Sequence, residues 1–278
     1  MPCARAGRCT CATTSDPTVP DLDPLVRRLR AAGCVFAEDE AAVLAATADG
    51  PELELLVERR VAGEPLEHLV GWADFAGVRV ALDPGVFVPR QRTAFLVELA
   101  VDRLGAGGVV VDLCCGSGAL GLTIAHRHPG VELHAADVDP VAVACARRNL
   151  APVGGTVHHG DLDHPLPDRL RGRVDVLVAN VPYVPTDAVA LMPPESRDHE
   201  PRATVDGGAD GLDVVRRLAG RAPEWLAPGG HLLVETGTDQ AHVAAAAFAT
   251  AGLAPTVHQD EDRGATAVSG QRPRDPVP

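Results

Sequence analysis

A glycine-rich stretch at residues 112–121 has residue types suited to binding a cofactor. Gly116, Gly118 and Gly121 follow the spacing GxGxxG, and Asp112 precedes them. Glycines let the backbone approach a ligand closely and leave free N–H groups at the start of the following helix. The spacing also occurs in NAD-dependent dehydrogenases, but a carboxylate here would repel the pyrophosphate of NAD. Because the same carboxylate would attract the ammonium of a methionyl group, the stretch favours S-adenosylmethionine over NAD.

Acidic residues follow two later strand patterns and could contact the rest of such a cofactor. Asp137 ends the predicted strand 131–136, where a carboxylate can accept both hydroxyls of a ribose. Its alternative role, capping the next helix, is filled equally well by Asp139. Asp161 and Leu162 follow a weak strand and are expected beside the adenine, where Asp161 could accept from the exocyclic amine. The alternative for Asp161 is a solvated loop carboxylate.

The sequence Asn180-Val181-Pro182-Tyr183 follows the strongest strand pattern, residues 174–179. An asparagine side chain offers one acceptor and two donors, and an aromatic face can stack on a planar amide. As a bare tetrapeptide this is ordinary turn material. Its expected position beside the glycine-rich stretch, at the C-terminal edge of a sheet, predicts a substrate site.

Alternating helix and strand patterns beyond Thr93 would position these stretches. Strands are expected at 109–113, 131–136, 155–158, 174–179, 231–235, 255–259 and 265–269. Helices are expected at 93–104, 117–127, 140–150, 211–221 and 239–250. Strands separated by helices predict a parallel sheet with right-handed crossovers, and the missing helix between the last two strands predicts one antiparallel strand.

The first part of the chain has a different pattern. Apolar spacing is helical from about residue 21 to 62, and an extended hairpin pattern at about 64–92 follows it. We therefore expect a disordered leader at 1–20, a helical domain at 21–75 that docks the substrate, and a cofactor-binding α/β domain at 76–278. The long segment from Tyr183 to Gly211 is expected to cover the substrate cleft.

Composition argues against several classes of protein. The net charge of −13 over 278 residues disfavours nucleic-acid binding over a broad surface. No run approaches the ~20 apolar residues of a membrane span, and the start of the chain lacks the apolar region of a signal peptide. Seven cysteines in a chain of this length fit a reducing compartment, so we expect a cytoplasmic protein.

Metal binding is not expected, although the chain offers candidate ligands. Cys3, Cys9 and Cys11 lack a fourth ligand at matching spacing. The pair His158-His159 and His199-Glu200 are expected to be ordinary loop residues.

The order of the motifs resembles the HemK-type protein N5-glutamine methyltransferases, which modify the glutamine of the Gly-Gly-Gln motif in peptide-chain release factors. The resemblance runs from about residue 20 onward. It is carried by Gly63-Glu64-Pro65, Gly71-Trp72, Phe75-Ala76-Gly77, Val88-Pro89-Arg90, Asp112–Gly118, Asp137, Asn180–Tyr183, Glu200-Pro201, Gly207–Leu212, Gly229-Gly230, Glu235 and Gln240. It implies a Rossmann-like, seven-stranded S-adenosylmethionine-dependent methyltransferase domain with a small helical N-terminal domain.

The resemblance also implies a set of site residues and a partner. The cofactor would be held by Asp112, Cys114, Cys115, Gly116, Ser117, Gly118, Asp137, Asp161, Leu162 and Asn180. The Asn180 side-chain oxygen and the Val181 carbonyl would accept the two N–H bonds of the target amide. Pro182 would fix the turn and Tyr183 would pack against the amide plane. The expected partner is a protein, a release factor with a Gly-Gly-Gln loop, and the enzyme is expected to be a monomer.

Several residues depart from the family pattern. Val181 stands where the family has the first proline of Asn-Pro-Pro-Tyr, and Cys114 stands where the glycine loop has its first glycine. Gln91 and Arg92 stand where the family has proline and an acidic residue, and Leu162 replaces an aromatic residue. These departures fit a divergent branch that keeps the family's methyl-transfer chemistry, and they leave the identity of the substrate protein open.

Two other functions fit the same motifs. A methyltransferase acting on the amino groups of nucleic-acid bases uses a similar Asn-x-Pro-Tyr turn with a flipped base. A protein with the cofactor fold could also bind a translation partner without catalysis. The acidic charge disfavours the first, and the joint presence of Asp112, Asp137, Asn180 and Tyr183 disfavours the second.

Overall fold

The first of two structural units is a small group of helices. The structure is a computed structural model that describes residues 22–274, and the chain divides after Val61 into two units. The first unit holds α1 (Asp23–Ala31), α2 (Ala37–Thr47) and α3 (Gly50–Val61). Arg60 on α3 donates to Glu40 on α2 through Nε (2.6 Å) and Nη2 (3.1 Å), a two-pronged pair that joins the helices. The expected leader at 1–20 lies outside the described residues.

The second unit begins earlier than the expected domain start at residue 76. It includes α4 (Leu66–Val70) and the antiparallel hairpin of β1 (Trp72–Phe75) and β2 (Val78–Ala81). Phe75 and Val80 are fully buried in the same hydrophobic cluster as the central sheet. The hairpin therefore belongs with the sheet because its apolar side chains are buried there.

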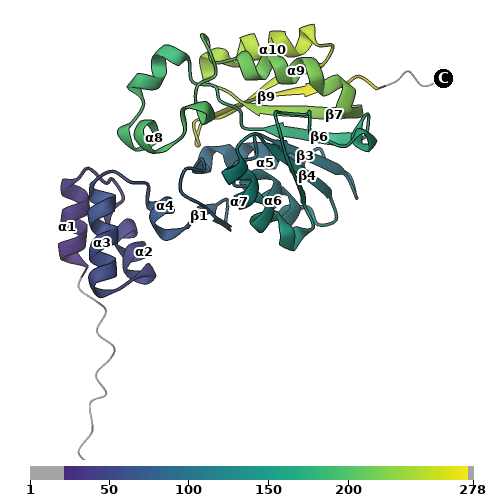
Figure 1. Cartoon of the computed structure of the whole chain (residues 1–278). Helices are drawn as coiled ribbons and strands as arrows, with labels where there is room; N and C mark the ends of the chain where they lie inside the picture. Colours follow the sequence, from purple (N-terminus) through teal and green to yellow (C-terminus); the bar gives the residue numbers. More distant parts are fainter. Residues whose placement is uncertain (1–21, 275–278) are drawn as a thin grey trace, which may run out of the picture. The chain divides into compact units, whose positions relative to one another are not determined.

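A seven-stranded sheet forms the centre of the second unit (Figure 1), and its strand order is β5-β4-β3-β6-β7-β9-β8. The strands are β3 (Val109–Leu113), β4 (Glu132–Asp137), β5 (Thr156–His159), β6 (Val174–Ala179), β7 (Leu226–Glu235), β8 (Ala254–Asp260) and β9 (Ala265–Gln271). The first five strands are parallel to one another, and β9 pairs antiparallel with both β7 and β8. The expected parallel sheet with an antiparallel strand near its end is confirmed.

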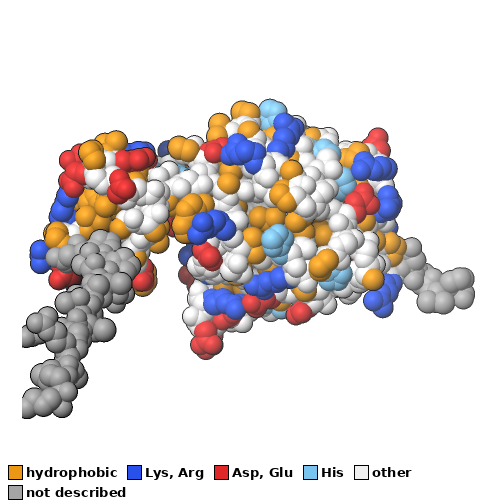
Figure 2. Space-filling model, turned by 90° about the horizontal axis from the view of Figure 1, so that it is seen from below, with side chains coloured by type: hydrophobic (Ala, Val, Ile, Leu, Met, Phe, Trp, Pro, Cys, Tyr) orange, Lys and Arg blue, Asp and Glu red, His pale blue; other side chains and the backbone are white. Residues whose placement is uncertain are grey.

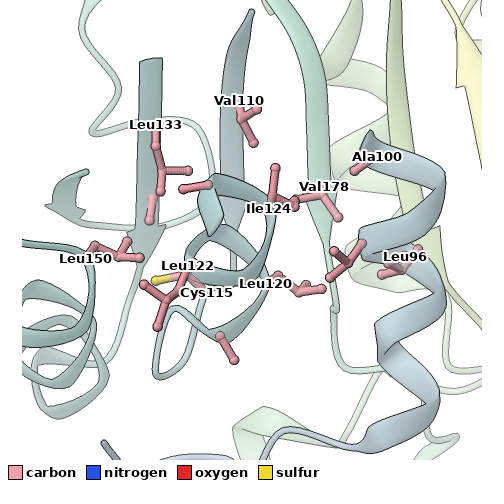
Figure 3. Close-up of a cluster of buried hydrophobic side chains, with 14 of the residues drawn as sticks. Leu96, Ala100, Val110, Cys115, Leu120, Leu122, Ile124, Leu133, Leu150 and Val178 are labelled. Atoms are coloured by element: carbon pink, nitrogen blue, oxygen red, sulfur yellow. The ribbon is translucent and has the colours of Figure 1, made fainter. Parts of the chain in front are cut away.

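Helices cover both faces of the sheet. The helices are α5 (Ala94–Val101), α6 (Ala119–Arg127), α7 (Pro140–Leu150), α9 (Asp213–Trp225) and α10 (Ala241–Thr250). One buried cluster joins α5, α6 and α7 to the sheet; Figure 3 shows Leu120, Leu122 and Ile124 of α6 lying between side chains of the neighbouring elements. A second cluster joins α9 and α10 to the opposite face (Figure 1).

The register of the central strands brings the predicted motifs together. Leu113 at the end of β3 pairs with Ala136 of β4 on one side and with Ala179 of β6 on the other. The glycine-rich loop, Asp137 and the Asn180 turn therefore leave the sheet from adjacent positions on one edge. This convergence is what the strand pattern predicted.

The segment after Tyr183 contains short helices. They are η4 (Thr186–Leu191), α8 (Pro194–His199) and η5 (Arg202–Thr204). The two ends of this segment lie side by side, because Val184 and Asp206 form a parallel β-bridge. In the described residues no helix is long and apolar enough to cross a membrane, and no group of three or more His, Cys, Asp or Glu could hold a metal ion.

Candidate active site

A cavity of about 440 Å³ lies within the second unit, at the C-terminal edge of the sheet. Its walls come from residues 85–93, the loop after β3, the start of α7, the turn after β6 and the segment 192–205. The volume lies in the usual range of ~300–1,000 Å³ for small-molecule sites. The segment expected to cover the cleft does supply one wall, through Met192, Glu200 and Val205 among others.

The loop after β3 adopts backbone conformations that favour glycine. Gly116 has φ +54°, and a Cβ built on it would meet no atom within 4 Å. Because Gly116 lines the cavity, the space beside it is room for a ligand. Cys114 also has a positive φ of 54°, although it carries a side chain. The residue at the family's first glycine position thus has a conformation that favours glycine, at a local cost of about 1–2 kcal/mol.

Asp112 occupies a different place from the one predicted for it. It is fully buried beneath the loop and is absent from the cavity wall. Its Oδ2 accepts the Gly121 N–H at 2.9 Å, and Oδ1 has no partner among the described residues. Burial raises the pKa of Asp112 to about 7, against the opposing effect of the Gly121 hydrogen bond. Asp112 thus holds the first turn of α6 in place and does not line the cavity.

Asp137 lies where the sequence placed it, in the cavity wall at the end of β4. Its Oδ2 accepts the Gly116 N–H at 2.8 Å and its Oδ1 accepts the Asp139 N–H at 2.9 Å. Asp139, not Asp137, caps α7, because its Oδ1 accepts the Val141 N–H at 2.8 Å. Burial raises the pKa of Asp137 despite these backbone hydrogen bonds. Each carboxylate oxygen has a second lone pair that can accept from a ligand hydroxyl.

The remaining residues predicted to bind the cofactor divide into two groups. Cys114, Cys115, Ser117 and Asn180 line the cavity together with Gly116 and Asp137. Gly118, Asp161 and Leu162 do not line it. Asp161 is paired with Arg217 of α9 instead, and Leu162 is buried with a positive φ of 49°.

The turn Asn180–Tyr183 presents free acceptors to the cavity. All four residues line it. The Asn180 Nδ2 donates to Thr93 Oγ1 at 3.4 Å, which leaves Oδ1 as the open end of the side chain. In the described part of the chain, no donor is bonded to Asn180 Oδ1 or to the Val181 carbonyl oxygen. Two acceptors on one short turn can receive the two N–H bonds of a primary amide.

Two glycines allow the backbone of a neighbouring strap, residues 207–211, to approach this turn closely. A Cβ on Gly207 would lie 2.6 Å from the Pro182 carbonyl oxygen, and a Cβ on Gly211 would collide with the Tyr183 carbonyl oxygen. Gln240 completes the contact, since its Nε2 donates to the carbonyl oxygens of Tyr183 and Asp210, each at 2.8 Å. The glycine cluster of the sequence is thus a packing requirement of the turn.

Sequence reasoning missed the groups that hold the Tyr183 ring. The Tyr183 hydroxyl donates to Glu235 Oε1 at 2.8 Å and accepts from Arg92 Nη2 at 2.6 Å. Arg92 Nε also donates to Glu235 Oε1 at 3.0 Å, which closes a triangle. Burial and the Glu235 charge raise the pKa of Tyr183 to about 12, so the phenol stays protonated at neutral pH. The sequence held two signals, Arg92 as a departure from the family pattern and Glu235 as one of the family's motifs, but nothing that paired them.

A second ion pair links α8 to the residues before α5. Arg90 Nη2 donates to Glu200 Oε1 at 2.5 Å and to Ser196 Oγ at 3.0 Å. Burial raises the pKa of Glu200, against the lowering effect of Arg90. The pair joins two walls of the same cavity, because all three residues line it.

The fold and the site define the class of this protein as an S-adenosylmethionine-dependent methyltransferase. The cavity fits the sulfonium cofactor, which has a polar ribose and a flat base. It offers open space beside Gly116, the Asp137 carboxylate, and the apolar side chains of Val86, Val138 and Ala142. The family model for the methyltransferase small domain matches residues 77–192.

Comparison with curated proteins gives the family. A release factor glutamine methyltransferase from Geobacter sulfurreducens is 37% identical over 219 residues, which cover 78% of this chain and 76% of the relative. One from Streptomyces coelicolor is 41% identical over 65% of each chain. The chain belongs to the release factor glutamine methyltransferase family. A 4-amino-L-phenylalanine/4-methylamino-L-phenylalanine methyltransferase from Streptomyces pristinaespiralis is 35% identical, over 81% of this chain and 79% of the relative.

Solved structures share the fold at lower identity. A methyltransferase from Pyrococcus furiosus has a TM-score of 0.53 and 15% identity, with 78% of this chain and 97% of that chain covered. The T. thermophilus 16S rRNA methyltransferase, in complex with AdoMet and guanosine, has a TM-score of 0.53 and 22% identity, with 72% and 49% covered. These similarities establish the fold alone.

Proposed function

We propose that this chain methylates the side-chain amide nitrogen of a glutamine, at the Gly-Gly-Gln motif of a peptide-chain release factor, acting as a cytoplasmic monomer. Membership of the family supports the reaction class. The observation that carries the proposal is the pair of free acceptors, Asn180 Oδ1 and the Val181 carbonyl oxygen, on the cavity wall. A primary amide has two N–H bonds on one nitrogen, and these acceptors match that arrangement.

The turn would act mainly by alignment. S-adenosylmethionine, when bound, supplies a methyl group on a sulfonium that is open to in-line displacement. An amide nitrogen is a poor nucleophile, because its lone pair is delocalised into the carbonyl. Asn180 and Val181 hold its two N–H bonds, aim the nitrogen and stabilise the positive charge that develops on it. Tyr183, fixed by Arg92 and Glu235, provides a flat surface against the amide plane.

No strong general base is needed in this scheme. An N-methylated cationic amide is very acidic and loses its proton to water. The Tyr183 phenol has a raised pKa of about 12, chiefly because of its burial, and is suited to packing and hydrogen bonding, not to proton removal.

The decisive experiment maps the methyl group on the product. The full chain is incubated with methyl-labelled S-adenosylmethionine and a release factor, and the modified residue is located by mass spectrometry. We expect one methyl group on the glutamine of the Gly-Gly-Gln motif. A release factor carrying glutamate at that position is the matched control and should stay unlabelled. Labelling elsewhere, or none, would refute the proposal.

A free aromatic amine is the main competing substrate, because one relative is named for 4-amino-L-phenylalanine. A parallel reaction with this amino acid tests it under the same conditions. If the enzyme methylates this amino acid faster than the release factor, its substrate is a small molecule and not a protein.

Nucleic acid is a weaker competitor. On the face shown in Figure 2, basic and acidic side chains of the described residues are intermixed and form no continuous basic stripe. A gel shift with duplex DNA and with structured RNA should therefore show no stable complex.

The helical unit is proposed to dock the protein substrate. Support comes from the cavity lining, all of whose residues belong to the second unit. A chain beginning near Glu64 should still bind S-adenosylmethionine but lose methylation of the release factor. Full activity of that shortened chain would contradict the docking role.

A further inference from the structure

Thr93 has a buried hydroxyl that is unused by its own helix. It immediately precedes α5, at the position where a threonine side chain usually caps a helix. Here its backbone is already helical (φ −65°, ψ −14°), and the side chain makes no capping hydrogen bond. Thr93 is 3% exposed and lines the cavity. Its hydroxyl contacts Asn180 Nδ2, at 3.4 Å.

We propose that Thr93 is a positioning residue that fixes which end of the Asn180 side chain faces the substrate. An asparagine amide can rotate by half a turn and exchange its oxygen and nitrogen. Only the oxygen can accept an N–H bond of the target amide. When Thr93 Oγ1 accepts from Nδ2, the oxygen is directed to the cavity and the nitrogen has a partner. The inference rests on the proposed function, because it requires a substrate that donates N–H bonds.

The Thr93 hydroxyl suits this task because its oxygen can accept from Nδ2. In that arrangement Oδ1 is already directed to the cavity before an N–H donor arrives. The hydrogen bond to Nδ2 also increases the electron density on Oδ1, because hydrogen bonds in a chain polarise one another. The acceptor is thereby strengthened as charge develops on the target nitrogen. Thr93 acts through Asn180 and touches no reacting atom.

The test compares Thr93→Val with Thr93→Ser. Valine keeps the shape and removes the hydroxyl, while serine keeps the hydroxyl. Thr93→Val should lower kcat about tenfold, the effect of one neutral hydrogen bond on a rate. Its affinity for S-adenosylmethionine and its melting temperature should stay near wild type, since the hydroxyl caps nothing. Thr93→Ser should restore most of the rate.

Thr123→Val is the matched control. Thr123 lies on α6, is fully buried, and its hydroxyl has no hydrogen-bond partner in the described structure. The substitution removes the same atom from a buried threonine that does not contact the turn. It should leave kcat unchanged.

A double-mutant cycle with Asn180→Ala decides whether Thr93 acts through Asn180. In the Asn180→Ala background, Thr93→Val should have no further effect on kcat. A tenfold loss that persists there, or a wild-type kcat for Thr93→Val alone, would overturn the inference. Failure of the proposed function looks different, because Asn180→Ala by itself would then retain the wild-type rate.

Discussion

The loop after β3 and the turn after β6 leave neighbouring strands at the same edge of the sheet, yet they are held in different ways. The loop is fixed by carboxylates, because Asp137 accepts the Gly116 N–H and Asp112 accepts the Gly121 N–H. The turn is fixed by backbone packing against the strap 207–211 and by the side chain of Gln240.

The difference matches what each segment must bind. The Asp137 carboxylate in the cavity wall favours a cationic ligand such as a sulfonium, whereas Asp112 is buried beneath the loop. The turn leaves Asn180 Oδ1 and the Val181 carbonyl oxygen without a donor among the described residues, which favours an uncharged donor such as an amide. Cys114, at a glycine position of the family, lies in this loop with a positive φ and lines the cavity.

The largest expected effect comes from adding one methyl group to the strap that holds the turn, compared with one added to the loop. Gly211→Ala should destabilise the protein by about 3–5 kcal/mol and abolish methylation, because the new Cβ collides with the Tyr183 carbonyl oxygen at a positive φ of 78°. Gly116→Ala, at φ +54° with open space beside it, should cost only about 1–2 kcal/mol of stability. Urea unfolding of both variants measures the difference. Equal losses would show that the two segments are held alike.

A pH effect on stability should come from Asp112 beneath the loop. Its pKa of about 7, raised chiefly by burial, lies above the ordinary value of 3.8 that applies when the chain unfolds. Between pH 4 and 7 the unfolded chain is ionised here while the folded chain stays protonated, so stability falls as the pH rises, by up to about 4 kcal/mol. Asp112→Asn removes this dependence. The urea midpoint of unfolding is measured from pH 5 to 8 for the wild type and for Asp112→Asn, and the difference between the two proteins should change with pH. A constant difference over this range would contradict a protonated buried carboxyl.

Cofactor affinity should depend on Asp137 and not on the turn. Asp137→Ala removes an acceptor in the cavity wall and frees the Gly116 N–H, so binding of S-adenosylmethionine should weaken by about 1.5–3 kcal/mol. Calorimetry on the ligand-free protein measures this. Measurable binding of NAD in place of S-adenosylmethionine would reverse the assignment of the loop.

The smallest expected effect concerns the family departure at Cys114. Cys114→Gly removes the penalty of a side chain at φ +54° but adds freedom to the unfolded chain. The net gain in stability should be at most about 1 kcal/mol, with methylation unchanged. A loss of stability on thermal unfolding would mean that packing of the Cys114 side chain outweighs its strain.

The strands and the order of the site could be predicted because they depend on local patterns. Residues 109–113 and 174–179 are predicted as strands with the bounds that the structure shows, since each is rich in valine and has clear ends. The domain boundary was harder, because the short elements between residues 66 and 81 carry little periodicity. Their membership of the second unit depends on where Phe75 is buried.

The side-chain contacts of the site lay beyond the sequence. Arg92 and Glu235 are 143 positions apart and meet only because the folded β7 ends beside the start of α5. Asp112 was expected in the cavity because it stands next to the glycines, but its side chain lies beneath the loop against Gly121. Proximity in sequence to a binding loop did not establish contact with the ligand.

The central claim is that the turn acts on the target nitrogen while the loop binds the cofactor, and Asn180→Ala tests it most directly. Single-turnover methylation of the release factor, cofactor affinity and melting temperature are measured on one preparation. We expect the rate to fall by about 2–4 kcal/mol in barrier height, because an acceptor that is engaged as charge develops has been removed. The affinity for S-adenosylmethionine and the melting temperature should change far less. A folded Asn180→Ala protein that transfers the methyl group at the wild-type rate would contradict the account.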